Sequence, residues 1–233
     1  MELASRRRFL LSAGAAVIAP VFAEAPLIAQ PNATPGRHPD TVLNRLLEGN
    51  RHFVAGTLTH PGRSPKDFRP LAQGQNPVAA IVGCADSRVP PEILFDQGVG
   101  ELFIIRIAGN YVNGAGASVK GSVEYAVAEL GVPLVMVLGH SQCGAVKAAM
   151  QHLHDNDALP GAINDLVNSI KPAVLESKGK PGDPLENAIQ ANVRRSVERL
   201  RTLDPIIAPA VQSGKVKVVG AVYDLTSGRV RLT

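Results

Sequence analysis

Two cysteines and one histidine stand where strands of a predicted sheet end. Cys84 directly follows an apolar run over residues 78–83, while His140 and Cys143 follow another over residues 134–138. Short apolar runs of this kind are typical of strands buried on both faces. Because the carboxyl ends of parallel strands line the functional crevice of open α/β sheets, we expect the three side chains to meet there.

Two thiolates and one imidazole are ligand types that zinc prefers, and three protein ligands leave a fourth tetrahedral position open, as in catalytic zinc sites. The spacing alone leaves two other interpretations open. Cys84 and Cys143 could form a disulfide in an exported protein, or they could be small core residues without chemistry. These are the only two cysteines among 233 residues, which excludes a disulfide-rich scaffold.

A carboxylate and a guanidinium follow the first cysteine, in Asp86 and Arg88. A charged pair at the end of a buried strand costs desolvation energy unless it is paired or functional. A structural salt bridge is the simpler interpretation. The position of the pair beside Cys84, a candidate metal ligand, favours a functional one.

The segments that carry these residues, CADSRVPPE and HSQCG, resemble the C-x-D-x-R and H-x-x-C signatures of the β-class carbonic anhydrases. The likeness extends through most of residues 40–225 and includes GQNP, ELFIIRIAGN and VEYAVAELGVP. The resemblance implies one Zn(2+) per chain. It implies the ligand set Cys84, His140 and Cys143.

The resemblance also implies a reaction, the reversible hydration of carbon dioxide to bicarbonate and a proton by a carbonate dehydratase, which is a lyase. Zinc-bound hydroxide would act with an Asp86–Arg88 catalytic dyad. By their offset from the signatures, Gln75, Phe103 and Tyr125 match the residues that line the family's substrate pocket. The family forms dimers or larger oligomers with that pocket at the dimer interface, so we expect a homo-oligomer in which these residues serve a neighbouring chain.

Two other functions stay open beside the resemblance. One is a zinc hydrolase of carbonyl sulfide or carbon disulfide, and the other is a non-catalytic zinc or redox-sensing module with Asp86 as fourth ligand. One subgroup of the family carries a tryptophan three residues before the first zinc cysteine, where this chain has Ile81. This favours the subgroup in which Arg88 holds Asp86 away from the metal and water completes the coordination.

Strand and helix patterns alternate along the chain. They predict an α/β fold with a mostly parallel β-sheet flanked by helices, in a single zinc-binding domain. The predicted strands cover residues 78–83, 102–107, 134–138, 216–223 and 229–232. The predicted helices cover residues 41–55 with Asp40 as N-cap, 118–130, 144–152, 161–176 and 184–203, and residues 57–77 read as a loop.

The start of the chain is typical of an exported protein. Three arginines at residues 6–8 precede an uncharged stretch rich in alanine and leucine, and residues 5–10 resemble a twin-arginine signal. We therefore expect a signal peptide and cleavage region over residues 1–29, a linker over 30–40 and the catalytic domain over 41–233. The expected location is the periplasm or the exterior of the cell.

Composition excludes several classes of protein. Hydrophobic residues at 45% and charged residues at 19% exclude a wholly disordered chain. The net charge of +4 is too small and too dispersed to indicate nucleic-acid binding. No apolar run reaches the length of about 20 residues that a membrane-spanning helix needs, so we expect no membrane association of the mature form. The resemblance implies a small-molecule substrate, carbon dioxide or bicarbonate. Four arginines of the helix over 184–203 are interpreted as a solvated surface: Arg194, Arg195, Arg199 and Arg201.

Overall fold

The predicted site residues are carried by a five-stranded sheet with the strand order β2-β1-β3-β4-β5. The computed structural model describes residues 37–233, so the predicted signal peptide and most of the predicted linker lie outside the described residues. The strands are β1 (Ala79–Gly83), β2 (Leu102–Arg106), β3 (Leu134–His140), β4 (Lys217–Tyr223) and β5 (Val230–Leu232). The first four pair in parallel and β5 runs antiparallel to β4, so the mostly parallel α/β sheet is confirmed.

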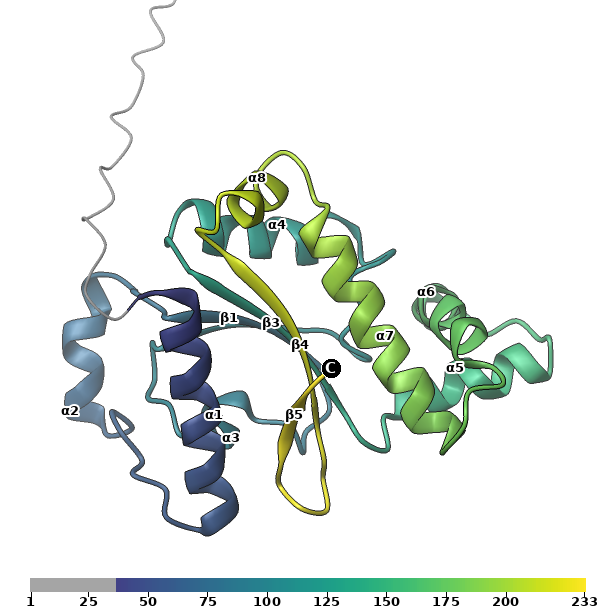
Figure 1. Ribbon diagram of the computed structural model, residues 1–233, viewed down its shortest axis with the longest axis horizontal. Coiled ribbons are helices and arrows are strands. Elements are labelled where there is room, and N and C mark those ends of the chain that lie inside the picture. Colours follow the sequence, from purple (N-terminus) through teal and green to yellow (C-terminus); the bar gives the residue numbers. More distant parts are fainter. Residues whose placement is uncertain (1–36) are drawn as a thin grey trace, which may run out of the picture. The chain divides into compact units, whose positions relative to one another are not determined.

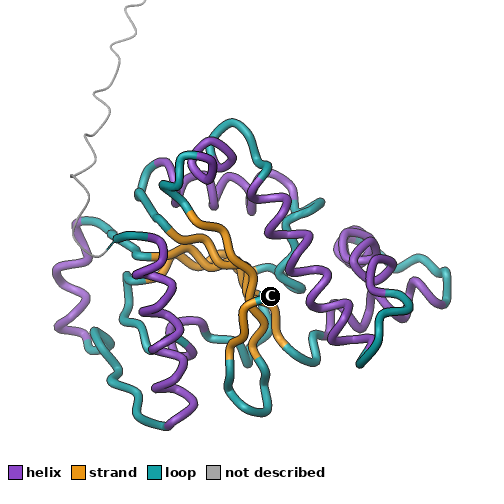
Figure 2. The backbone as a smooth tube through the Cα atoms, viewed as in Figure 1, coloured by secondary structure: helices purple, strands orange, loops and turns teal. Residues whose placement is uncertain are grey.

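Helices cover both faces of this sheet (Figures 1 and 2). They are α1 (Pro39–Ala55), α2 (Pro65–Phe68), α3 (Pro91–Leu94), α4 (Gly116–Ala128), α5 (Gly144–His154), α6 (Ala162–Ser177), α7 (Pro184–Arg201) and α8 (Ile207–Gln212), with a 3-10 turn, η1 (Arg69–Gln73). Within residues 37–233, no helix combines the length and the apolar character that crossing a membrane requires.

The central strands are buried on both faces because their side chains alternate between two apolar layers. Ala80 and Val82 of β1 pack with apolar residues of α4, α7 and α8. Ala79 and Ile81 pack on the opposite face with residues of α1 and α3. Every residue of β1 and β3 is buried, which explains why these strands read as continuous apolar runs in the sequence.

Helix α7 lies close against the sheet because two glycines make room for it. A Cβ atom added at Gly139 of β3 would stand 2.7 Å from Val193 Cγ2, and one at Gly220 of β4 would stand 2.7 Å from Val193 Cγ1. Side chains at these two positions would therefore push α7 away from the sheet. Since β3 carries His140 at its end, this packing also fixes the strand that carries part of the site.

The first helix begins earlier than its sequence pattern indicated. It starts at Pro39 with His38 as N-cap, so the prediction that Asp40 caps the helix is wrong. Proline suits the first helical position because its φ is already helical and its missing N–H would have no partner there. Asp40 lies inside the first turn and binds Lys217 of β4 through its carboxylate.

Other differences concern short elements. Strand β3 runs to His140, two residues beyond the prediction, because it pairs with β4 along its whole length. The segment predicted as a loop contains α2 and η1, and the sequence patterns did not indicate α3 or α8. These elements have four to six residues, too few for a helical period to be visible.

A buried carboxylate holds the loop that follows α1. Asp96 accepts hydrogen bonds from Thr59 N (2.8 Å), Thr59 Oγ1 (2.8 Å) and His60 N (3.1 Å). The side chains of His52 and Arg63 lie 3.3 and 3.7 Å from it. Burial by itself raises the pKa of Asp96, but these donors outweigh it and lower the pKa to about 2.

We predict that Asp96→Asn lowers the free energy of unfolding by about 2–3 kcal/mol near neutral pH. The pKa of Asp96 in the folded protein is about 2, below its ordinary value of 3.8. The ionised carboxylate therefore stabilises the fold fully at pH values above 3.8. That stabilisation is lost as the pH falls from 3.8 to about 2. Urea unfolding at about pH 7 and pH 3 measures the effect, and the variant should lose less stability on acidification than the wild type.

Asp165→Asn, which changes an exposed aspartate of α6, is the matched control for this measurement. If Asp96→Asn and the wild type lost the same free energy on acidification, the carboxylate would not be the source of the acid dependence.

Candidate active site

The structure brings the three predicted ligand residues together. One ligand atom each from Cys84, His140 and Cys143 lies within 4.8 Å of the others, and all three residues are buried. Cys84 follows β1, His140 ends β3, and Cys143 is the N-cap residue of α5. The neighbouring positions of β1 and β3 in the sheet therefore create the cluster. Both cysteines are free thiols in this structure.

Backbone amides point at the sulfur of the first cysteine. Gly109 N donates to Cys84 Sγ at 3.2 Å and Asp86 N donates to it at 3.4 Å. The hydrogen bond from the Cys143 thiol contributes most to lowering the pKa of Cys84, against the effect of burial, and the amides add to it. The same contact raises the pKa of the Cys143 thiol that donates it.

Only glycine fits at the turn that supplies the first of these amides. Gly109 has φ +84°, and a Cβ atom there would stand 2.6 Å from Ile170 Cδ1 of α6. The turn is anchored from behind because buried Asn192 of α7 donates from Nδ2 to Gly109 O at 2.8 Å. The amide that faces the Cys84 sulfur is thus held by packing from both α6 and α7.

The imidazole is oriented with one nitrogen toward the cluster. His140 Nδ1 lies 2.9 Å from Ser141 O, so Nδ1 carries the proton and donates. His140 Nε2 is buried and has no hydrogen-bond partner among the described residues. A buried nitrogen lone pair without a donor, beside two sulfurs, is the arrangement that a zinc ion satisfies. The donor set therefore fits zinc.

The carboxylate of Asp86 is gripped by its neighbour in the sequence. Arg88 donates from Nε to Oδ1 at 2.9 Å and from Nη2 to Oδ2 at 2.8 Å, and its amide donates to Oδ1 at 3.0 Å. These hydrogen bonds hold the pKa of Asp86 well below its usual range. Asp86 Oδ2 lies 3.8 Å from His140 Nε2. The carboxylate thus borders the cluster while Arg88 engages both of its oxygens.

A second guanidinium braces the same turn and was not singled out in the sequence. Arg106 donates from Nε to Cys84 O at 2.9 Å, and its Nη2 donates to Asp86 O. Arg106 ends β2 and stands opposite Gly83 in the register of the two strands. The sequence indicated this role only through a basic residue at the end of a predicted strand. To predict its contacts, one must also know that β2 pairs with β1.

The three predicted pocket residues do not join the cluster within one chain. Gln75 precedes β1, at the opposite end of that strand from Cys84. It lines a hollow of about 310 Å³ with residues that include Phe68, Leu71 and Val99.

The two aromatic pocket residues form a separate group. Phe103 is the second residue of β2 and stands opposite Ala80 in the register. Its ring centroid lies 6.1 Å from that of Tyr125 of α4, and Tyr125 is 48% exposed. One chain therefore presents Gln75 and this aromatic pair apart from its own candidate metal ligands.

Comparisons with known proteins agree with this geometry. The family model described as carbonic anhydrase matches residues 79–230. "Carbonic anhydrase 2" of Mycobacterium tuberculosis is 40% identical over 198 residues, covering 85% of this chain and 94% of the relative. The carbonic anhydrase of Mycolicibacterium smegmatis is 38% identical over 198 residues, covering 85% and 95%.

Solved structures show the same likeness. The β-carbonic anhydrase CcaA superimposes with a TM-score of 0.65 at 31% identity, covering 82% of this chain and 94% of the other. The Coccomyxa β-carbonic anhydrase in complex with acetazolamide gives a TM-score of 0.63 at 28% identity, covering 82% and 85%. The parallel sheet and its cysteine–histidine–cysteine cluster define a β-type carbonic anhydrase architecture. The chain belongs to the carbonic anhydrase family, and it is an enzyme of the carbonate dehydratase type.

We predict about one zinc ion per wild-type chain and loss of most of it in Cys84→Ser, because a serine hydroxyl remains protonated where a thiolate binds the metal. Metal analysis of protein dialysed against a mild chelator measures this. His152→Ala is the matched control, since His152 Nδ1 pairs with Asp157. Wild-type protein without zinc, or native protein with Cys84 bonded to Cys143, would contradict the assignment of the ligands.

Proposed function

We propose that this protein catalyses the reversible hydration of carbon dioxide to bicarbonate and a proton, with one Zn(2+) per chain held by Cys84, His140 and Cys143. The observation that carries the proposal is the gathering of these three donor atoms within 4.8 Å in a chain of this family. When bound, zinc supplies the Lewis acidity that makes water nucleophilic near neutral pH.

Asp86 orients the water that attacks carbon dioxide. Its Oδ1 atom receives two hydrogen bonds from Arg88, whereas Oδ2 receives one and faces His140 Nε2. Oδ2 therefore has capacity to accept a further hydrogen bond from a water molecule at the cluster. Since Arg88 keeps the pKa of Asp86 far below its usual range, the carboxylate is a poor store for a proton. Its role is to aim the nucleophile rather than to remove its proton.

Arg88 and Arg106 keep that acceptor in place. Arg88 fixes the plane of the carboxylate through two side-chain contacts, and Arg106 fixes the backbone by binding Cys84 O and Asp86 O. A paired guanidinium and carboxylate have a defined mutual orientation, because both groups are planar. The nucleophile then meets an acceptor that needs little rearrangement when charge develops.

We predict that Asp86→Asn lowers kcat/KM for carbon dioxide hydration at least about a hundredfold while zinc is retained. The amide removes the negative acceptor and places a donor beside Arg88, so the water loses its orientation. Stopped-flow hydration assays normalised to zinc content measure this, with Asp165→Asn as control. Wild-type activity per zinc in Asp86→Asn would remove this residue from the mechanism.

The substrate pocket, in this proposal, is shared between two copies of the chain in a homo-oligomer. Gln75, Phe103 and Tyr125 of one copy would line the site that holds another copy's zinc. Supporting this, one chain keeps these residues apart from its own ligand cluster, and Tyr125 is 48% exposed. A β-carbonic anhydrase of Sordaria macrospora that shares the fold, at 24% identity and a TM-score of 0.64, is described as tetrameric.

We predict that co-expressed Asp86→Asn and Tyr125→Ala chains form mixed oligomers more active per zinc than either parent. If Tyr125 serves its neighbour, the Tyr125→Ala subunit keeps a normal Asp86 and receives an intact tyrosine from the other chain. Differently tagged chains, purified in two steps and assayed by stopped flow, provide the measurement. No gain over the parents would show that each chain supplies its own Tyr125.

Export by the twin-arginine route is also part of the proposal, supported by the sequence Ser5-Arg6-Arg7-Arg8-Phe9-Leu10, which lies outside the described residues. Export after folding would protect zinc-bound thiolates from pairing in an oxidising compartment. We predict that Arg6→Lys combined with Arg7→Lys leaves the precursor in the cytoplasm, as measured by cell fractionation. Arg8→Lys, outside the paired positions, is the control. Unchanged export of the double variant would exclude this route.

A further inference from the structure

Helix α7 buries two polar side chains on one of its faces. They belong to Asn192 and Ser196, which are 3% and 1% exposed. The two residues are four positions apart, so they lie on the same face of the helix. Burying a polar side chain costs free energy unless it forms hydrogen bonds. The partners of these two residues therefore indicate what they do.

Both side chains hold the backbone of the segment that follows β2, over residues 109–113. Asn192 donates from Nδ2 to Gly109 O at 2.8 Å. Ser196 Oγ accepts a hydrogen bond from Val112 N at 3.1 Å. Each of the two buried polar side chains thus has a partner in the same short segment.

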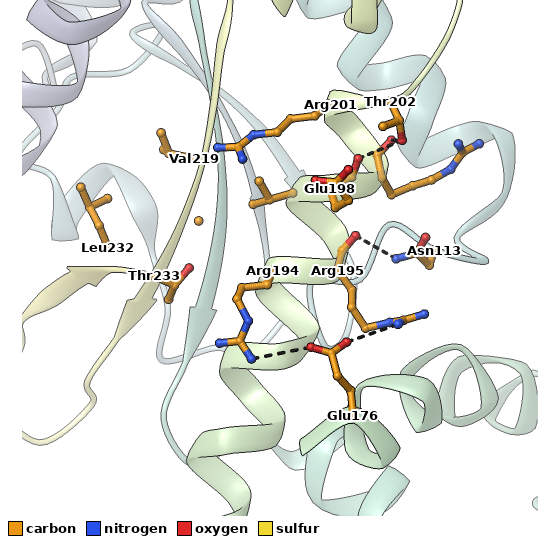
Figure 3. Close-up of a pocket in the computed structure, with 13 residues that line it drawn as sticks. Asn113, Glu176, Arg194, Arg195, Glu198, Arg201, Thr202, Val219, Leu232 and Thr233 are labelled. Carbon is orange, nitrogen blue, oxygen red and sulfur yellow. Dashed lines mark hydrogen bonds and ion pairs between the residues drawn. The ribbon is translucent and has the colours of Figure 1, made fainter. Parts of the chain in front are cut away.

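A third contact runs in the opposite direction, from the segment to the helix. Asn113 donates from Nδ2 to the main-chain oxygen of Arg195 at 3.1 Å. Figure 3 shows the side chain of Asn113 reaching α7 at this point. The segment and the helix are therefore tied together by side chains of both partners.

The other side of Gly109 faces a candidate metal ligand. Its N–H donates to Cys84 Sγ at 3.2 Å, while its carbonyl accepts from Asn192. A glycine is required here, since φ is +84° and a Cβ atom would stand 2.6 Å from Ile170 Cδ1. Glycine also has the greatest backbone freedom of any residue. The hydrogen bond from Asn192 restricts that freedom and keeps the N–H directed at the sulfur.

The helix that carries Asn192 is seated on the strand that carries His140. A Cβ atom added at Gly139 of β3 would stand 2.7 Å from Cγ2 of Val193, the next residue of α7. Close-packed contacts of this kind transmit a position with little slack. Asn192 therefore relates the sulfur of Cys84 to the strand of the second candidate ligand.

We propose that Asn192 is a positioning residue that, through Gly109, tunes how strongly the Cys84 sulfur donates electrons to the metal. This inference rests on the proposed function, because it requires a metal at the cluster. An amide hydrogen bond stabilises negative charge on a sulfur and reduces its donation to a bound cation. The cation then keeps more of the Lewis acidity that the hydration of carbon dioxide uses.

Substitution of zinc by cobalt(II) in the full chain tests the proposal, because the sulfur-to-cobalt charge-transfer band reports electron donation by the thiolates. Asn192→Leu keeps the branched shape of the side chain and removes the donor. We expect its band to move to longer wavelength and its zinc affinity to fall about tenfold. Ser196→Ala frees only Val112 N, so we expect a smaller shift in the same direction.

Asn50→Leu is the matched control for the loss of a buried amide. Asn50 of α1 is buried, and its Nδ2 donates to Leu94 O at 3.1 Å and to Gly228 O at 3.0 Å, both outside the 109–113 segment. We expect this variant to lose stability in urea unfolding while its charge-transfer band stays at the wild-type wavelength.

A wild-type band and zinc affinity in folded Asn192→Leu would overturn the proposal, as would an equal shift in Asn50→Leu. If Asn192→Leu does not fold, an unshifted band in Ser196→Ala overturns it. Absence of a thiolate band in the cobalt-treated wild type would instead contradict the metal site of the proposed function, and this inference would fall with it.

Discussion

The parallel register between β1 and β3 is the constraint on which the site depends. Gly83 stands opposite Leu138, so Cys84 leaves β1 at the level where β3 continues to His140. Side chains alternate between the two faces of a strand, so a slip of one residue would carry the imidazole to the other face. The register is specified because both faces of both strands are buried, and Gly139 lets α7 press against β3.

Around that cluster, hydrogen-bond donors face the sulfur of Cys84 and the carboxylate of Asp86. The Cys84 sulfur receives amide hydrogen bonds from Gly109 and Asp86, and Asp86 in turn is held by Arg88. Arg106 adds a second cation, whose hydrogen bonds within residues 37–233 go to backbone carbonyls of the turn. Each negatively charged group near the ligands is therefore contacted by hydrogen-bond donors: the Cys84 sulfur by backbone amides, and the Asp86 carboxylate by Arg88. Among the three candidate ligands, His140 Nε2 has no hydrogen-bond partner within residues 37–233, and it is the atom that a bound cation would engage.

The sequence predicted the elements that carry the ligands, because strands buried on both faces leave unmistakable apolar runs that end at Cys84 and near His140. It did not predict contacts that depend on which strands are neighbours. Arg106 reaches the turn after Cys84 because β2 pairs with β1, and the sequence alone does not show that pairing. The start of α1 was missed since a histidine, rather than Asp40, occupies the capping position.

A site divided between copies, as proposed for Gln75 and Tyr125, gives the loop before β1 a second function. The buried carboxylate of Asp96 holds the beginning of that loop by binding Thr59 and His60. In one chain this contact only stabilises the fold, since Gln75 and Cys84 lie at opposite ends of β1. In an assembly, where Gln75 lines a neighbour's site as proposed, the same contact would also help to hold the segment that leads through α2 and η1 to Gln75. The hydrogen bonds of Asp96, which stabilise the fold of one copy, would then also contribute to the shape of the pocket in another. Catalytic activity would depend on assembly even with every zinc ligand intact.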